Sequence, residues 1–206
     1  MAGLREEVAD ESLMVSYQRG NREAFALLVR RYERPIYNFA LRQLKDAAAA
    51  EDATQEVFLR VVQNATEFKH EARFTTWLYA IARNLCIDQL RKSKHRRHPS
   101  LNQPRNLANA DGPTMLETMP TNSPEADAER ALTSSHVART VVTAVEGLPD
   151  DQREVFLLRQ LAGLPFKDVA EIVGVGENTV KSRMRYALER LQQALSEFEE
   201  YARALK

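Results

Sequence analysis

The distribution of proline is the feature that most constrains the fold of this chain. Five of the eight prolines lie within residues 99–124, among many Asn, Ser and Thr residues and without a periodic apolar pattern. Such a stretch cannot bury enough apolar surface to offset the entropy lost on ordering, so it predicts a flexible linker. We therefore expect a first domain at residues 1–98, a linker at 99–127 and a second domain at 128–206.

Apolar residues recur at helical spacing in the first domain. We expect Asn21 to cap a helix that Pro35 kinks or restarts. A further helix is predicted from about residue 48 to 65, and a long one from Thr75, as its cap, to about Arg97. Glycine is scarce, with seven in 206 residues, and turns between strands need glycine. The predicted fold class is therefore all-α.

The second domain shows the same helical spacing. The pattern predicts helices over residues 128–145, from Asp150 or Asp151 to near Gly163, over 166–173 and over 178–202. The last of these helices is expected to bury one apolar stripe, made of Val180, Met184, Ala187, Leu188 and Leu191.

Several classes of protein are disfavoured by what the chain contains. Cys86 is the only cysteine, which excludes an internal disulfide and a zinc cluster built on cysteines. The four histidines are scattered, and we find no Gly-rich phosphate loop. We therefore expect no catalytic site, no metal and no cofactor. No apolar run approaches 18 residues and the first residues lack an apolar signal core, so we expect no membrane insertion and a cytoplasmic location.

Charge is segregated along the chain although the formal net charge is zero. Residues 46–67 carry five acidic side chains against one basic, and residues 83–97 carry six basic against one acidic. Residues 181–190 carry four basic side chains against one acidic. The two basic segments indicate two sites for a polyanion, and the acidic segment indicates a surface for another partner. Each run, taken alone, is also compatible with an ordinary solvated helix face.

Residues 166–183, FKDVAEIVGVGENTVKSR, have the pattern of a helix-turn-helix. Ala170 is small where two helices would cross, Gly174 permits the tight turn, and Val180 would fill the core between the helices. The second helix would turn polar and basic side chains toward a major groove, where Arg, Lys and Asn can contact base edges. The alternative is a plain helical hairpin with a basic outer face. The candidate DNA-contacting residues are Asn178, Thr179, Lys181, Ser182, Arg183, Arg185 and Tyr186.

Three segments, in order, resemble the sigma-70 family of bacterial transcription initiation factors. They are AEDATQEVFLRV at residues 50–61, FTTWLYAIARNLCIDQLRK at residues 74–92, and Leu148-Pro149 followed by the helix-turn-helix. The short two-domain chain is similar to the extracytoplasmic-function (ECF) group of that family. In such factors the helix that matches residues 50–64 docks on the RNA polymerase core. The resemblance implies that role for Asp52, Gln55, Glu56 and Phe58.

The resemblance also implies a melting role for the segment that matches residues 68–95, which in the family opens the minus-ten element and captures the non-template strand. Replacement stacking and phosphate contacts must offset the cost of unstacking bases. Core packing is the alternative role for Phe74 and Trp77. The candidate residues are Phe68, Phe74, Trp77, Arg83, Asn84, Asp88, Arg91 and Lys92.

The sequence thus predicts a non-enzymatic sigma factor that binds core RNA polymerase, directs it to promoters and assists melting. The helix-turn-helix would read the minus-thirty-five element in duplex DNA, and an anti-sigma factor is a further expected partner. One alternative is a homodimeric helix-turn-helix regulator that binds duplex DNA without polymerase. Another is a protein-interaction module without a DNA role. Zero net charge favours dependence on polymerase, because a lone DNA-binding domain is usually basic.

Overall fold

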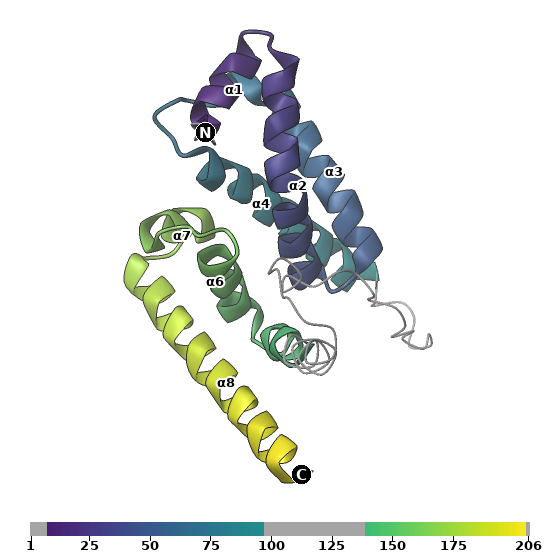
Figure 1. Ribbon diagram of the computed structural model, residues 1–206, viewed down its shortest axis with the longest axis vertical. Helices are drawn as coiled ribbons and strands as arrows, with labels where there is room; N and C mark the ends of the chain where they lie inside the picture. The colour runs from purple at the N-terminus through teal and green to yellow at the C-terminus, as the bar shows by residue number, and fades with distance from the viewer. Residues whose placement is uncertain (1–7, 97–138, 205–206) are drawn as a thin grey trace, which may run out of the picture.

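The computed structural model describes residues 8–96 and 139–204 (Figure 1). Within these ranges the regular elements are helical and none is a strand, which confirms the predicted all-α fold class. No helix in the described part of the chain is long and apolar enough to cross a membrane. The elements are α1 (Asp10–Gln18), α2 (Arg22–Leu44), α3 (Ala47–Gln63), the 3₁₀ helix η1 (Ala65–Glu67), α4 (Phe74–Arg96), α6 (Asp150–Gln160), α7 (Phe166–Val173) and α8 (Glu177–Ala204).

Two of the predicted segments fall wholly or partly outside the described ranges. The linker expected at 99–127 lies outside them entirely. Of the helix expected over 128–145, the described residues 139–146 are helical, and the chain then turns at Gly147.

Helix α2 begins as the sequence predicts but does not break at Pro35. The Asn21 side chain accepts hydrogen bonds from the backbone N–H of Glu23 at 3.0 Å and of Ala24 at 3.4 Å, which confirms it as the cap. Pro35 lies inside a single helix that continues to Leu44, so the helix does not restart at the proline, which was one of the two predicted outcomes. A proline inside a helix costs about 3 kcal/mol, whereas burying one large apolar side chain contributes about 1.5–3 kcal/mol.

Continuing α2 past Pro35 places three apolar residues, Ile36, Phe39 and Ala40, in the core. Their burial outweighs the local cost of proline. Helix α3 packs beside α2 and is capped by Asp46, whose carboxylate accepts from the N–H of Ala49 at 2.9 Å. The buried apolar residues of α3 are Ala50, Ala53, Val57 and Val61.

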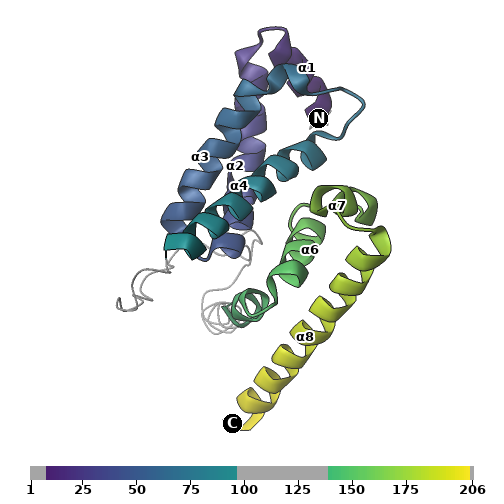
Figure 2. The same cartoon turned by 180° about the vertical axis from the view of Figure 1, so that it is seen from behind.

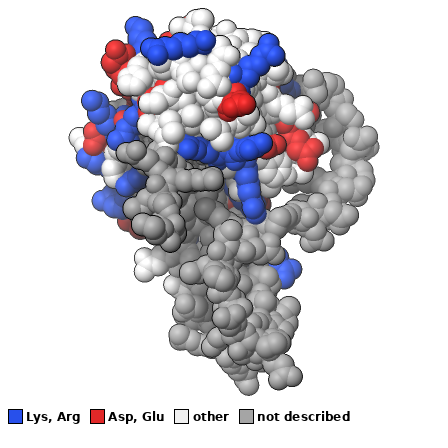
Figure 3. Space-filling model, turned by 45° about the horizontal axis from the view of Figure 1, so that its top comes forward, with Lys and Arg blue, Asp and Glu red and all other residues white. Residues whose placement is uncertain are grey.

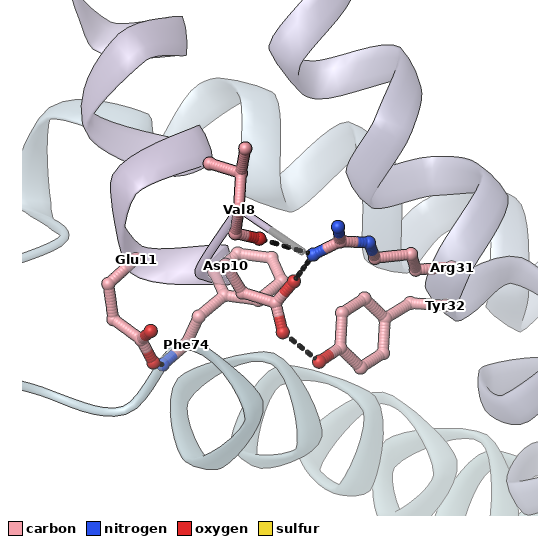
Figure 4. A network of polar contacts seen from close by, with 6 residues as sticks. All are labelled: Val8, Asp10, Glu11, Arg31, Tyr32 and Phe74. Atoms are coloured by element: carbon pink, nitrogen blue, oxygen red, sulfur yellow. Dashed lines mark hydrogen bonds and ion pairs between the residues drawn. The ribbon is translucent and has the colours of Figure 1, made fainter. Parts of the chain in front are cut away.

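Two carboxylates at the start of α1 connect it to α2 and α4 (Figure 4). Asp10 accepts from Arg31 at 2.5 Å and from the hydroxyl of Tyr32. Burial, followed by the hydrogen bond to Asp10, raises the pKa of Tyr32 well above its usual value, so the hydroxyl stays protonated and keeps donating. Glu11 accepts from the backbone N–H of Phe74 at 2.9 Å, at the first residue of α4.

Helix α4 therefore starts one residue before the predicted cap, Thr75. Thr75 was the wrong cap because the capping carboxylate comes from Glu11, which lies 63 positions away in the chain. An interaction of this kind depends on tertiary structure and has no local sequence signature.

The second domain packs α6 and α7 against α8 (Figure 1). Arg153, in the first turn of α6, is buried. Its guanidinium donates to the carbonyl of Leu148 at 2.9 Å and pairs with Asp150 at 2.6 Å. These bonds hold the turn at Leu148 and Pro149 against α6. The core of this domain comprises Leu148, Val155, Leu157, Leu158, Leu164, Val169, Val180, Met184, Ala187 and Leu191.

The two domains are in contact. Figures 1 and 2, which view the molecule from opposite sides, both show α6 and α7 beside α4, with α8 on the far side of them. Polar bonds join the domains at two places on α4, where Thr76 donates to Asp168 at 2.6 Å and Arg83 donates to Glu154 at 2.6 Å. A third bridge joins Arg42 on α2 to Glu146.

We predict that Glu11→Ala destabilises the first domain by about 1 kcal/mol, the usual effect of losing a side-chain cap. The reason is that the N–H of Phe74 would lose its acceptor at a partly buried helix start. Urea denaturation followed by circular dichroism measures the change. Glu71→Ala, which removes an exposed glutamate from the loop before α4, is the control. Equal stability of the two variants would contradict the capping role.

Candidate nucleic-acid interface

The exposed face of α3 is the first candidate surface. Asp52 and Gln55 are exposed, as the sequence predicts for a docking face. Leu59 and Val62 follow on the same face, at helical spacing, with 55% and 43% of their surface exposed. The face thus joins a carboxylate and an amide to two apolar side chains. Leu59 and Val62 were missed in the sequence, although their spacing from Asp52 would have found them.

The other two residues expected on α3 lie beside this face. Glu56 is half-buried and pairs with Arg60 one turn along at 3.1 Å. Phe58 is also half-buried and packs edge-to-face on Phe25, with ring centroids 6.4 Å apart. Phe58 therefore turns toward α2, and its surroundings favour packing between the two helices.

Three aromatic rings gather where the loop after η1 meets α4. Phe68, Phe74 and Trp77 have ring centroids 5.3–6.1 Å apart. The amide of Gln18 holds the loop by donating to the carbonyls of Ala65 at 2.7 Å and Phe68 at 2.9 Å. Phe68 and Phe74 are buried and Trp77 is half-buried. In this conformation the two phenylalanines serve the core, and only Trp77 offers ring surface to a base.

Past the aromatic rings, α4 presents a polar and basic face. Asn84, Asp88, Arg91 and Lys92 are exposed, and the first three follow helical spacing along one side. Arg83 differs from them, because its side chain is only 20% exposed and its Nε donates to Glu154 of the second domain. Of the five polar residues expected to bind the strand, the structure thus places four on the exposed surface of α4. The fifth, Arg83, is paired with the second domain.

Cys86 lies on the buried side of α4. Burial, and after it the charge of Glu154, raises the pKa of this thiol to about 12. The thiol is therefore protonated near neutral pH, when it is a poor nucleophile and a poor metal ligand. The described residues contain no group of three or more His, Cys, Asp or Glu side chains placed to hold a metal ion.

The helix-turn-helix has the predicted geometry. Gly174 adopts a left-handed conformation, with φ at 76°, and its N–H donates to the carbonyl of Ala170 at 2.9 Å. Val169 and Val180 are fully buried between the helices. The turn places the start of α8 at an angle to α7, with the polar side of α8 directed outward.

The outer face of α8 carries the residues expected to contact a groove. Arg183 is more covered and pairs with Asp151 at 3.2 Å. Lys181 pairs with Glu177 at 2.7 Å, and the guanidinium of Arg185 lies 4.9 Å from the ring centre of Tyr186. Exposed pairs contribute less than about 1 kcal/mol, so phosphates can replace them at little cost. The exposed members are Asn178, Thr179, Lys181, Ser182, Arg185 and Tyr186.

The sequence placed Leu188 in the buried stripe of α8, and this prediction was wrong. It is 47% exposed and lines a groove of about 540 Å³ with Val141, Phe156, Leu191 and Leu195. Leu188 lies at the edge of the apolar arc, where partner helices no longer cover it. The groove gives the second domain an apolar surface separate from its basic face.

Known proteins share both domains. Residues 28–96 match the family described as Sigma-70 region 2, and residues 138–191 match Sigma-70, region 4. The ECF RNA polymerase sigma factor SigW of Bacillus subtilis is 33% identical over 178 residues, which is 86% of this chain and 92% of SigW. The RNA polymerase sigma-H factor of Pseudomonas aeruginosa is 33% identical over 187 residues, covering 90% and 93% of the two chains.

Solved structures share the fold. The sigma factor RpoE of Bartonella quintana, in complex with the anti-sigma factor NepR, superposes with a TM-score of 0.66. The identity is 23%, over 84% of this chain and 96% of that one. CnrH, in complex with the cytosolic domain of CnrY, gives a TM-score of 0.62 at 21% identity, over 92% and 98%.

The two matched regions and the relatives make this chain a sigma-70 family protein, a class of transcription initiation factor. Within that family it belongs to the ECF sigma factors, which confirms the resemblance found in the sequence. An ECF sigma factor binds core RNA polymerase and directs it to promoters. The comparisons give no support to the alternative of a homodimeric regulator.

We predict that Gly174→Ala destabilises the second domain by about 1–2 kcal/mol, because a Cβ is disfavoured in the left-handed region. Gly174→Asn should cost less, since asparagine tolerates that region better. A Cβ at this position meets no steric obstacle, since no neighbouring atom lies within 4 Å of it. Urea denaturation measures both variants. Equal losses for alanine and asparagine would show that backbone conformation is not the cause.

Proposed function

We propose that this sigma factor divides promoter recognition between α4 and α8 and binds polymerase through α3 and the second domain. The observation that carries the proposal is that the two domains each present an exposed polar and basic helix face on a helix whose other side is core. The proposed domain boundaries are those of the sequence, with a linker at residues 99–127. The factor would act in the cytoplasm and would itself catalyse no reaction.

Helix α4 suits a separated strand better than a duplex. Asn84 carries a donor and an acceptor for a base edge, and Arg91 and Lys92 lie along the same helix for phosphates. Trp77 offers a half-buried ring for stacking. Phe68 and Phe74 support this role from the core by fixing the position of Trp77.

Helix α8 suits the major groove of duplex DNA. Asn178, Lys181, Ser182 and Arg185 lie on one exposed side, and Arg183 flanks it toward α6. Base contacts would come from the first group and phosphate contacts from Arg183. The ring of Tyr186 beneath the guanidinium of Arg185 would help to orient it.

Two surfaces are available for the core polymerase. The α3 face offers Asp52 and Gln55 for basic and polar groups of the partner, and Leu59 and Val62 for apolar contact. The groove lined by Leu188 offers an apolar site on the second domain. We also propose an anti-sigma factor as a partner, because the structural neighbour RpoE is solved in complex with the anti-sigma factor NepR.

A gel-shift assay with a promoter fragment, with and without core polymerase, tests the proposed function. Specific retention of the fragment should require both the factor and the core. The face in Figure 3 shows acidic side chains interspersed among the basic ones, so it offers no uniformly basic surface to DNA. Specific binding by the factor alone would instead favour the homodimeric regulator, and absence of binding to the core would overturn the proposal.

We predict that Asp52→Arg weakens binding to core polymerase at least about tenfold, equivalent to about 1.4 kcal/mol, through charge reversal at an exposed contact. Competition against a labelled wild-type factor measures the affinity. The control is Glu33→Arg, which makes the same reversal at an exposed position on α2. Equal affinity of the two variants would remove Asp52 from the interface.

We predict that Asn84→Ala leaves the closed promoter complex intact and slows opening about tenfold, as expected for one lost base contact of about 1–3 kcal/mol. Permanganate reactivity of unpaired thymines follows opening with time. The control is Asn38→Ala, which removes an amide from α2. Opening at the wild-type rate in Asn84→Ala would show that this amide does not hold a base.

A further inference from the structure

One short helix, α1, contacts both ends of the loop that precedes α4. At the start of the loop, the amide of Gln18 donates to the carbonyls of Ala65 at 2.7 Å and Phe68 at 2.9 Å. At its end, the carboxylate of Glu11 accepts from the N–H of Phe74 at 2.9 Å. Both ribbon views show this loop beside α1 (Figures 1 and 2). The two ends of the loop are therefore held by the same element.

The two contacts are in register along α1. Glu11 and Gln18 are seven positions apart, which is two helical turns, so both side chains lie on one face, about 10 Å apart along the axis. The helix is itself fixed on α2, because Asp10 accepts from Arg31 and from the hydroxyl of Tyr32 (Figure 4). A helix fixed in this way sets the distance between the two ends of the loop.

The loop between these contacts, residues 69–73, has exposed side chains and buried neighbours. All five of its residues are exposed, whereas Phe68 before it and Phe74 after it are buried. Within the loop, the N–H of Ala72 donates to the carbonyl of Lys69 at 3.0 Å. The loop is thus a surface segment whose two ends are fixed in the core.

Trp77 links the ends of the loop to the polar face of α4. The centroid of its ring lies 5.3 Å from that of Phe68 and 6.1 Å from that of Phe74. These two phenylalanines are the residues whose backbone groups Gln18 and Glu11 hold. A shift at either end of the loop therefore moves a ring against which Trp77 packs.

From these contacts we propose that Glu11 and Gln18 are positioning residues for promoter melting, which hold the 69–73 loop and Trp77 in the arrangement that receives the separated strand. The inference rests on the proposed function, which offers the ring of Trp77 to a base. Neither Glu11 nor Gln18 is among the residues expected to touch DNA, so both act through the loop and its rings. A loop already held in its binding arrangement avoids the entropy cost of being ordered when the strand binds.

Three variants of the full chain and two controls test the proposal. Gln18→Met and Glu11→Ala each remove one contact between α1 and the loop. Glu11→Gln removes the charge but keeps a side-chain oxygen that can accept from Phe74. The first control, Asp46→Ala, removes the cap of α3 and so tests for a general loss of stability. The second, Gln160→Met, makes the methionine substitution at an exposed position on α6.

The free factor gives the first readout. Trp77 is the only tryptophan in the chain, so its emission reports the surroundings of its ring without any DNA. Gln18→Met and Glu11→Ala should expose the ring further and increase its quenching by acrylamide. Glu11→Gln and the two controls should match the wild-type factor.

The complex with core polymerase gives the second readout. Its probe is the labelled non-template strand of the promoter fragment used in the gel shift. If the loop keeps its binding arrangement in about a tenth of the molecules of Gln18→Met or Glu11→Ala, affinity for this strand falls about tenfold. Opening followed by permanganate should slow by a similar factor. Affinity for the core and formation of the closed complex should not change, whereas a general folding defect would weaken both.

Each other outcome overturns a defined part of the proposal. Wild-type quenching in both Gln18→Met and Glu11→Ala would show that α1 does not position the loop. Increased quenching with wild-type strand affinity would show that this position does not matter for melting. A loss of strand affinity as large in Asp46→Ala would assign the effect to stability, and one as large in Glu11→Gln would assign it to charge.

The proposed function fails in a different way. It would be contradicted if the wild-type factor with core polymerase did not bind the non-template strand. The quenching of Trp77 in the free factor does not depend on that result, so it still decides whether α1 holds the loop.

Discussion

The structure of the first domain depends on one helix meeting two demands. Helix α4 must bury Phe74, Leu78 and Leu85 to complete the core, and must keep polar groups such as Asn84 and Arg91 in solvent. Its start is fixed from a distance by Glu11, and its rotation is fixed by the buried rings. A helix anchored in this way cannot turn its basic side inward, so the core determines which residues can meet a strand.

In the second domain, a turn fixes which side of α8 is buried and which side is exposed. Gly174 sets the angle between α7 and α8, and the burial of Val180 and Ala187 sets the rotation of α8. The ion pairs of Lys181 and Arg185 on α8 are exposed and local to that helix, so phosphates can replace them at little cost. Rigid placement thus comes from apolar packing, and the exposed polar groups remain available for DNA.

Local signals in the sequence predicted much of this arrangement. The cap Asn21, the turn at Gly174 and the buried stripe of α8 other than Leu188 all follow from neighbouring residues. The errors arose where tertiary contacts decide. The continuation of α2 through Pro35 depends on the core beyond it, and the bridge between Arg83 and Glu154 joins residues 71 positions apart. A sequence shows the charge of such residues but not which partner each one meets.

The ion pairs between the domains and the zero net charge of the chain lead to the same physical requirement. A factor that pairs its acidic residues with its own basic ones has little charge left to attract DNA at a distance. Under the proposed function, binding to the polymerase must supply the attraction to promoter DNA that the factor alone lacks. Core binding and promoter recognition are then coupled, because each raises the affinity for the other.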